Sequence, residues 1–389
     1  MTLPYFDHSF VAVIIQILLQ MKRSFTVLTV LSAAILFTAS CSKDKEVVAP
    51  PVDEVIPAYD VPTTYNFANA DFLKASQRVK MGAELNSYLG TANNAVITAA
   101  KANDYFDNKN NLFTTDASLN ASGVTLAEKT TDPAFFRGHF TTQATNSLSN
   151  GVAASDGVAG VVISGTTKRL VGPTGLESNQ AVAKGLMGAL FFKEAVNLLT
   201  NIPNDDNKTV TNGTTLAQRH WDEAFGNLGV PIDYDPSKTY VNTDPTRPLL
   251  WGGYLAERGK EILAGKTIFD AFLKGRAALG ANDKKVVAAQ IKIILDKWEQ
   301  LNAAAALEYS TIPTRSVNVG NLATQFHALS EGFGFIHSLQ FRPATSKLSA
   351  ADYATLKATF ATSFYTLINE PGFTKLVQAQ TILKTTYGL

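Results

Sequence analysis

Residues 71–89 have the sequence DFLKASQRVKMGAELNSYL, in which apolar side chains recur at intervals of three and four. The positions that would share one broad face are Phe72, Leu73, Ala75, Val79, Ala83 and Leu85. This spacing is typical of an amphipathic helix, since a helix places residues three and four apart on the same side. The stretch therefore predicts a helix with one face in a hydrophobic core.

The same periodicity dominates the later segments. It predicts helices at about 91–106, 132–148, 178–199, 214–228, 249–263, 266–279, 283–309, 318–341, 349–367 and 371–384. Residues 151–175 are rich in glycine and include a few β-branched residues (Val161, Val162 and Ile163), so we expect an ordered loop, with a small hairpin as the alternative. No series of alternating strands and turns is present, so the predicted fold class is all-α.

A short repeated pattern suggests that the helical region has two similar halves. Glu223-Ala224-Phe225-Gly226 and Glu331-Gly332-Phe333-Gly334 each follow a histidine on a predicted helix. Internal similarity of this kind can mark a duplication. We therefore predict two helical bundles, with halves at roughly 63–230 and 247–389.

The N-terminal region has the features of a bacterial lipoprotein signal peptide. Residues 21–40 contain a basic start, a short apolar run and small residues, and they lead directly to Cys41, the only cysteine in the chain. We predict that Cys41 is the lipid acceptor. Residues 1–20 hold a second apolar run before this signal peptide, and we interpret them as an over-extended gene start.

Residues 41–62 are expected to connect the lipid to the helical region. The stretch after Glu46 is rich in proline, valine and acidic residues and has no helical period, which predicts an extended tether. Ser42-Lys43-Asp44-Lys45-Glu46 is similar to a short export signal that directs some lipoproteins to the cell surface. The predicted location is the outer membrane at the cell surface, with its periplasmic face as the alternative.

Composition restricts the possible functions. The 389-residue chain has 46% hydrophobic and 17% charged residues, which is normal for a globular protein. Its formal net charge of +1 and the lack of a basic stripe give no reason to expect a nucleic-acid partner. With Cys41 lipidated, no thiol remains for a disulfide, a zinc–thiolate site or a cysteine nucleophile.

Two histidine–glutamate pairs are the candidate chemical groups. His220 and Glu223 are three residues apart and His327 and Glu331 are four apart, so each pair would share one helix face. Such a pair can be a structural contact between packed helices, a metal or ligand site, or part of a catalytic site. Neither pair belongs to a His-Glu-x-x-His zinc-protease motif.

The chain resembles a family of surface lipoproteins of unknown function related to the imelysins, the insulin-cleaving membrane protease-like proteins. The motifs that carry the resemblance are Gly175-Leu176-Glu177, Lys184-Gly185-Leu186-Met187-Gly188-Ala189, His220-Trp221-Asp222-Glu223-Ala224-Phe225-Gly226, Gly229-Val230-Pro231, Asp270-Ala271-Phe272-Leu273-Lys274-Gly275-Arg276 and His327-Ala328-Leu329-Ser330-Glu331-Gly332. The imelysin motif is Gly-x-His-x-x-Glu. Here Gln218 replaces its glycine, and the second pair has one extra residue between His327 and Glu331.

The resemblance implies two helical bundles and a role near iron acquisition. It makes His220, Glu223, His327 and Glu331 the candidate ligands for iron, another divalent metal or haem, with Asp222 as a residue that orients a ligand. The expected partners are the membrane, through acylated Cys41, and an outer-membrane uptake protein. A lipoprotein that only contacts other proteins is the first alternative, and a metallopeptidase of the imelysin type is the second.

Overall fold

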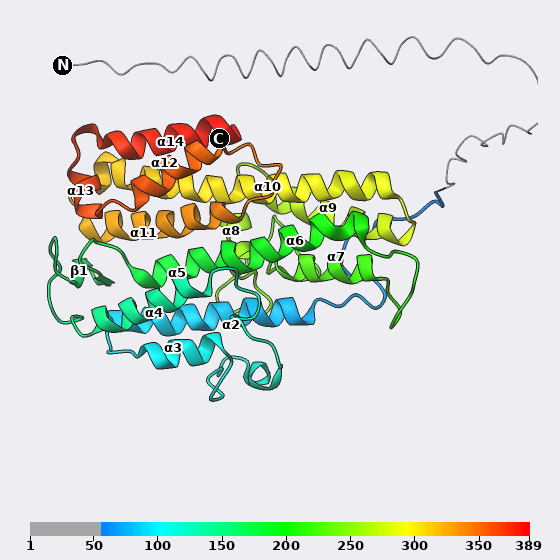
Figure 1. Cartoon of the computed structure of the whole chain (residues 1–389), viewed down its shortest axis with the longest axis horizontal. Coiled ribbons are helices and arrows are strands. Elements are labelled where there is room, and N and C mark those ends of the chain that lie inside the picture. The colour runs from blue at the N-terminus through cyan, green and yellow to red at the C-terminus, as the bar shows by residue number, and fades with distance from the viewer. Residues whose placement is uncertain (1–55) are drawn as a thin grey trace, which may run out of the picture. The chain divides into compact units, whose positions relative to one another are not determined.

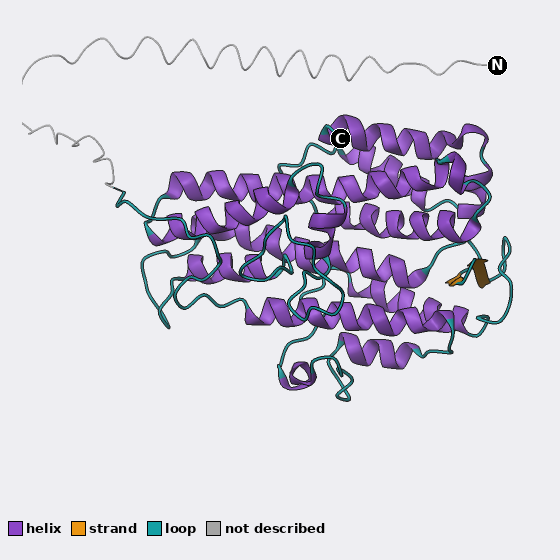
Figure 2. Cartoon of the chain, turned by 180° about the vertical axis from the view of Figure 1, so that it is seen from behind, coloured by secondary structure: helices purple, strands orange, loops and turns teal. Residues whose placement is uncertain are grey.

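Helices form most of residues 56–389, the part of the chain that the computed structural model describes (Figures 1 and 2). The predicted all-α class is confirmed. The predicted signal peptide, Cys41 and the first part of the tether lie outside the described residues. Residues 56–62, the end of the predicted tether, contain no helix or strand.

Most elements up to residue 226 follow the predicted helices, but the helix predicted at 91–106 is α-helical only over Ala99–Phe106, after a 3₁₀ turn at Thr91–Asn93. In chain order they are α2 (Leu73–Gly90), α3 (Ala99–Phe106), α4 (Pro133–Ser147), strands β1 (Gly160–Ser164) and β2 (Thr167–Val171), α5 (Ser178–Leu186), a π-helix (Met187–Phe192), α6 (Lys193–Asn201) and α7 (Leu216–Gly226). The Asp132 carboxylate accepts a hydrogen bond from the Phe135 N–H and caps α4, as the Asp-Pro pattern predicts. A capping box between Thr215 and Gln218 begins α7.

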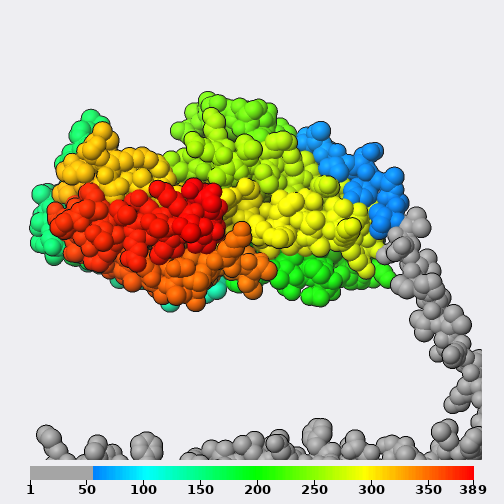
Figure 3. All heavy atoms as spheres, turned by 90° about the horizontal axis from the view of Figure 1, so that it is seen from above, coloured from blue at the N-terminus to red at the C-terminus, as the bar shows by residue number. Residues whose placement is uncertain are grey.

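The remaining elements contain the longest helix. They are α8 (Trp251–Glu257), α9 (Ala264–Gly280), α10 (Lys284–Thr311), α11 (Leu322–Ser338), α12 (Ala350–Phe360), α13 (Phe364–Asn369) and α14 (Thr374–Tyr387). The predicted helix at 249–263 is shorter than expected, because α8 ends at Glu257 and the chain turns before α9 begins. The C-terminal helices α12 and α14 pack on α11 and α10, and they are drawn in orange and red beside the yellow α10 in Figure 3.

The prediction of an ordered loop at 151–175 is wrong in part. Residues of this stretch form a small hairpin, which was the alternative prediction. Strands β1 and β2 pair antiparallel, with Val161 opposite Leu170. The β-branched run Val161–Ile163 favours a strand. Gly165 lies in the turn at a φ of 58°, a conformation that glycine adopts readily. The hairpin matters because β2 carries Arg169 toward α11.

Helices from both predicted halves pack together in one compact unit of residues 56–389. The helix pair α5–α11 joins them, as do α7–α9 and α6–α10. The π-helix also packs on α11, where Gly188 lies so close to Ser338 that a Cβ on the glycine would overlap the Ser338 backbone. A division into two bundles therefore stays a prediction. Among the described residues, no helix combines the length and hydropathy needed to cross a membrane.

Candidate functional site

His327 lies between two buried carboxylates. Its Nδ1 is 3.1 Å from Glu177 Oε1, and its Nε2 is 3.5 Å from Glu331 Oε1. The Glu177 and Glu331 side chains are 1% and 8% exposed, whereas His327 retains 25% of its side-chain exposure. The imidazole is therefore the part of this group that solvent can reach. We call Glu177, His327, Glu331 and the cations beside them, Arg169 and Lys184, the His327 cluster.

Local structure explains how α5 and α11 bring these groups together. His327 and Glu331 are one turn apart on α11, so both face the same neighbour. Glu177 immediately precedes α5, and its backbone N–H donates to the Ser330 hydroxyl at 2.9 Å. Lys184 comes from the last turn of α5. A Cβ on Gly334 would overlap the Lys184 side chain, so the glycine allows the two helices to approach closely.

Two cations balance the two carboxylates. The Arg169 guanidinium is 2.7 Å from His327 Nδ1 and 3.7 Å from Glu177 Oε2, and Lys184 Nζ is 3.3 Å from Glu331 Oε1. Both contacts of Nδ1 involve a hydrogen bond: the neutral ring nitrogen accepts from Arg169, and the protonated one donates to Glu177 Oε1.

The charged form of Glu331 is favoured in the fold. Burial alone would raise the pKa of Glu331, but the nearby charges of Lys184 and His327 outweigh it, and the pKa lies below its usual range. Two buried tyrosines extend the polar group. The Tyr254 hydroxyl is 3.5 Å from Glu331 Oε2 and 2.9 Å from the Tyr309 hydroxyl. Glu331 is thus an ionised acceptor at neutral pH.

The other predicted pair has separate partners. His220 Nδ1 is 2.7 Å from Asp205 Oδ2, while Glu223 lies 3.8 Å from Arg78 and 4.0 Å from Lys129. Figure 1 shows α7, which carries this pair, and α11 toward opposite ends of the longest axis. The structure therefore does not bring the two pairs together into one four-residue site.

Asp222 is in the core, where it forms an ion pair. Its carboxylate accepts from Arg276 Nε at 2.7 Å and from the Tyr65 hydroxyl at 2.8 Å, and it makes no hydrogen bond to His220 or Glu223. Burial raises the pKa of Asp222 even though Arg276 and Tyr65 lower it. The geometry gives Asp222 a place in the packing of α7 against α9, where it does not orient either predicted ligand of its own helix.

Sequence reasoning missed three members of the His327 cluster. Arg169 and Glu177 are 158 and 150 residues from His327, so no local spacing links them. The sequence did contain a hint for Glu177, because this residue directly precedes a predicted helix and belongs to one of the motifs on which the family resemblance depends. The hairpin that presents Arg169 was only the alternative interpretation of its segment.

The donor atoms fit a metal ion in part. Glu177 Oε1 and His327 Nδ1 are 3.1 Å apart, a separation that suits two neighbouring ligands with metal bonds of about 2.0–2.2 Å. The positively charged Arg169 is close to both residues, so a metal would have to displace it. Among the described residues, no group of three or more His, Cys, Asp or Glu side chains is arranged to hold a metal.

Comparison with family models gives a match over most of the chain. Residues 62–385 match the family described as "Domain of unknown function (DUF4856)". No curated protein and no solved structure matches the chain. The matched residues include the whole His327 cluster and both predicted histidine–glutamate pairs. The resemblance to imelysins stays a prediction.

Proposed function

The chain belongs to this domain family of unknown function, and from that premise we propose that it is a lipid-anchored binding protein of the cell envelope that takes part in iron or haem acquisition. The proposed ligand site is the His327 cluster. The observation that carries the proposal is the 3.1 Å separation of a half-buried imidazole nitrogen and a buried carboxylate, with a cation already attracted to them.

Electrostatics support a cation at this position. Glu177 is a buried carboxylate whose Oε2 makes no hydrogen bond to a described residue. Its Oε1 is 3.1 Å from His327 Nδ1 and its Oε2 is 3.7 Å from Arg169, so a bound cation would add to the charge compensation of this buried carboxylate. The Arg169 side chain is 24% exposed, so it can turn toward solvent when another cation arrives. Imidazole and carboxylate are common ligands of iron and of zinc.

Two alternatives remain. Every predicted ligand already has an ion-pair partner, which favours the reading in which the pairs only stabilise the fold and the lipoprotein acts through protein contacts. A metallopeptidase would need about three protein ligands and an open position for water. The geometry of the described residues favours this last alternative least, since Arg169 and Lys184 occupy the surroundings of the two donors.

Metal and haem titration of the full chain in detergent tests the proposal. The protein would be stripped of metal and titrated with Fe²⁺, Fe³⁺, Zn²⁺ and haem by calorimetry, beside His327→Ala and Glu177→Gln variants. We expect saturable binding that both substitutions weaken by about tenfold or more, since each removes one of few ligands. His220→Ala is the matched control, because His220 lies on α7 with its own partner.

The outcomes separate the alternatives. Binding that is lost in His327→Ala and kept in His220→Ala supports the His327 cluster as the ligand site. Binding that is lost only in His220→Ala would show that the ligand site is on α7. If no ligand binds the wild-type protein, the metal proposal fails and the protein-contact alternative is favoured.

A further inference from the structure

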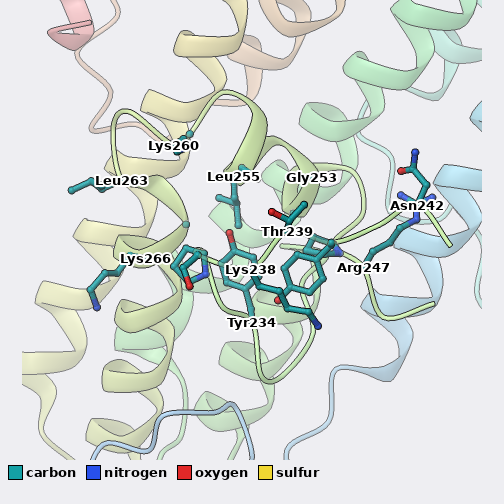
Figure 4. A pocket seen from close by; sticks show the side chains of 18 residues that line it. Tyr234, Lys238, Thr239, Asn242, Arg247, Gly253, Leu255, Lys260, Leu263 and Lys266 are labelled. Atoms are coloured by element: carbon teal, nitrogen blue, oxygen red, sulfur yellow. The ribbon is translucent and has the colours of Figure 1, made fainter. Parts of the chain in front are cut away.

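A second concave site lies away from the His327 cluster. It is a pocket of about 650 Å³ formed by the segment after α7, by α8 and by the first turn of α9 (Figure 4). This volume is within the usual range for sites that bind small organic ligands. Because Tyr234 lies in its wall, we call it the Tyr234 pocket. Nothing in the sequence motifs had pointed to it.

The charged residues of this pocket are all basic. They are Lys238, Arg247, Lys260 and Lys266, and no aspartate or glutamate lines the pocket. Figure 4 shows Arg247, Lys260 and Lys266 on different sides of the Tyr234 ring. Lys238 and Lys266 are paired with Asp244 and Asp270. The side chains of Arg247 and Lys260 make no ion pair or hydrogen bond with another described residue, so their charges are available to a ligand.

Two tyrosines provide the uncharged wall. Tyr234 and Tyr240 are nearly parallel, with an interplanar angle of 7° and ring centroids 6.2 Å apart. Tyr234 is only 4% exposed, yet its hydroxyl makes no hydrogen bond to a described residue. Tyr234 lines the pocket, so its hydroxyl can donate a hydrogen bond to water or to a ligand there. A Cβ on Gly265 would collide with this hydroxyl, so the absence of a side chain at Gly265 leaves room for the Tyr234 ring.

The start of α9 adds to the positive potential. Gly265 and Lys266 lie in the first turn of this 17-residue helix, and no side chain caps its N-terminus. The free N–H groups of a helix start carry partial positive charge and favour anions. This effect acts together with the unpaired Arg247 and Lys260 and with the unpartnered Tyr234 hydroxyl.

We propose that the Tyr234 pocket binds a small organic anion, in which a carboxylate or phosphate is attached to a ring. The basic side chains attract the anionic group, the Tyr234 hydroxyl donates a hydrogen bond to it or to a neighbouring oxygen, and the ring packs against the tyrosine wall. The proposal does not depend on the metal site, since the two sites share no residue.

Calorimetry on the full chain with three probes tests this inference. Phenyl phosphate has both the charge and the ring, inorganic phosphate has only the charge, and benzyl alcohol has only the ring. We expect phenyl phosphate to bind saturably and more tightly than either of the others. Its affinity should fall by about tenfold in Arg247→Gln/Lys260→Gln, because two unpaired charges are removed, and it should weaken as salt is added.

Controls distinguish a specific site from general attraction. Lys74→Gln removes an exposed lysine of α2 that does not line the pocket, and it should leave the affinity for phenyl phosphate unchanged. Tyr240→Ala should weaken phenyl phosphate but not inorganic phosphate. Thermal melting checks that each variant is folded. The proposal is overturned if phenyl phosphate does not bind the wild-type protein, if the double variant binds it equally well, or if Lys74→Gln weakens it to the same extent.

Discussion

Gly275 of α9 lies directly against the indole ring of Trp221 on α7, so close that a Cβ on the glycine would overlap the ring. Trp221 is fully buried, and its indole N–H donates to the Phe272 carbonyl at 3.1 Å, which holds the ring in place. The close contact of α7 with α9 therefore requires a glycine at position 275.

Substitution of this glycine should destabilise the protein. We expect Gly275→Ala to lower the free energy of unfolding by about 1–3 kcal/mol, because the ring cannot move without disturbing a packed core. Gly280→Ala, at the end of the same helix, is the matched control, since a Cβ there meets nothing within 4 Å. It should be neutral or stabilise the protein by up to about 1 kcal/mol. Urea unfolding of both variants measures the difference, and equal effects would contradict the packing argument.

Removal of Arg276 should leave a buried charge unpaired. Arg276 and Asp222 are 5% and 0% exposed, and the ion pair between them connects α9 to α7. We expect Arg276→Met to lower the free energy of unfolding by about 3–5 kcal/mol, since Asp222 would stay buried without its cation. The double variant Asp222→Leu/Arg276→Met should recover a large part of this loss. A double variant as unstable as the sum of both single variants would show that the pair is not coupled.

Two buried imidazoles should make the fold sensitive to acid. Burial lowers the pKa of His139 and of His337 from 6.5 to about 4. The ring of His337 stacks on Phe135 at 3.8 Å between centroids, and the charged groups that face it are Asp132 and Lys357, with His139 beside them. The folded protein thus keeps both rings neutral at a pH where the unfolded chain binds protons.

The sign of the effect follows from this difference. Above about pH 6.5 the rings are neutral in both the folded and the unfolded protein, and the free energy of unfolding is at its full value. As the pH falls toward about 4, the unfolded chain binds protons that the folded protein does not, so the free energy of unfolding decreases by up to ~3 kcal/mol for each ring. Urea unfolding at pH 7 and pH 5 measures the loss. The variant His139→Leu/His337→Leu should lose less stability over this range than the wild type does. His220→Leu is the control, since this imidazole is partly exposed and paired with Asp205. A double variant that loses as much stability between pH 7 and pH 5 as the wild type does would contradict the prediction.

Arg169 should compete with a metal ion at the His327 cluster. If the proposed site is correct, Arg169→Ala removes the cation next to His327 Nδ1 and Glu177, so metal affinity should rise by about fivefold or more. Arg219→Ala is a control, since among the described residues that guanidinium bonds only to the carbonyls of Thr211 and Thr214. Calorimetry with the tightest-binding metal measures the change. Lower affinity in Arg169→Ala would show that Arg169 supports the ligand instead of competing with it.

Lipidation at Cys41 can be tested in cells. We expect Cys41→Ser to move the protein from the membrane fraction to the soluble fraction and to abolish incorporation of labelled palmitate, because the signal-peptide pattern predicts this thiol as the lipid acceptor. Ser42→Ala changes the adjacent residue and should leave both readouts unchanged. Palmitate labelling that persists in Cys41→Ser would falsify the lipoprotein prediction. Protease treatment of intact cells then distinguishes the cell surface from the periplasmic face.

The helices could be predicted because their signals are local. In α4, Asp132 and Pro133 define the first turn by capping and by a fixed φ, and both effects act within four residues. The boundaries were less predictable where local signals conflict with packing. The segment after Glu257 continues a helical pattern, yet it turns at Gly259 and at Leu263, which has a φ of 54°. That turn forms one side of the Tyr234 pocket.

The candidate site was predictable only in part. His327 and Glu331 are one turn apart on one helix, so the sequence alone places them on one face. Glu177 reaches them only because α5 packs against α11, and Arg169 only because a hairpin folds beside that contact. His220 and Glu223 show the opposite case. Their spacing also predicts that both lie on one helix face, but His220 pairs with Asp205 and Glu223 pairs with Arg78 and Lys129.

The sequence by itself determined the all-α class, the positions of most helices and the pairing of residues within one turn. These features depend on backbone geometry and on the alternation of apolar and polar residues over short distances. The tertiary structure alone decided which distant side chains meet, as Glu177 does with His327 and Asp222 with Arg276. It also decided that Tyr234, Arg247 and Lys260 line one pocket. Such contacts depend on how helices pack, and helix packing is set by the shapes of many side chains together, which no local pattern contains.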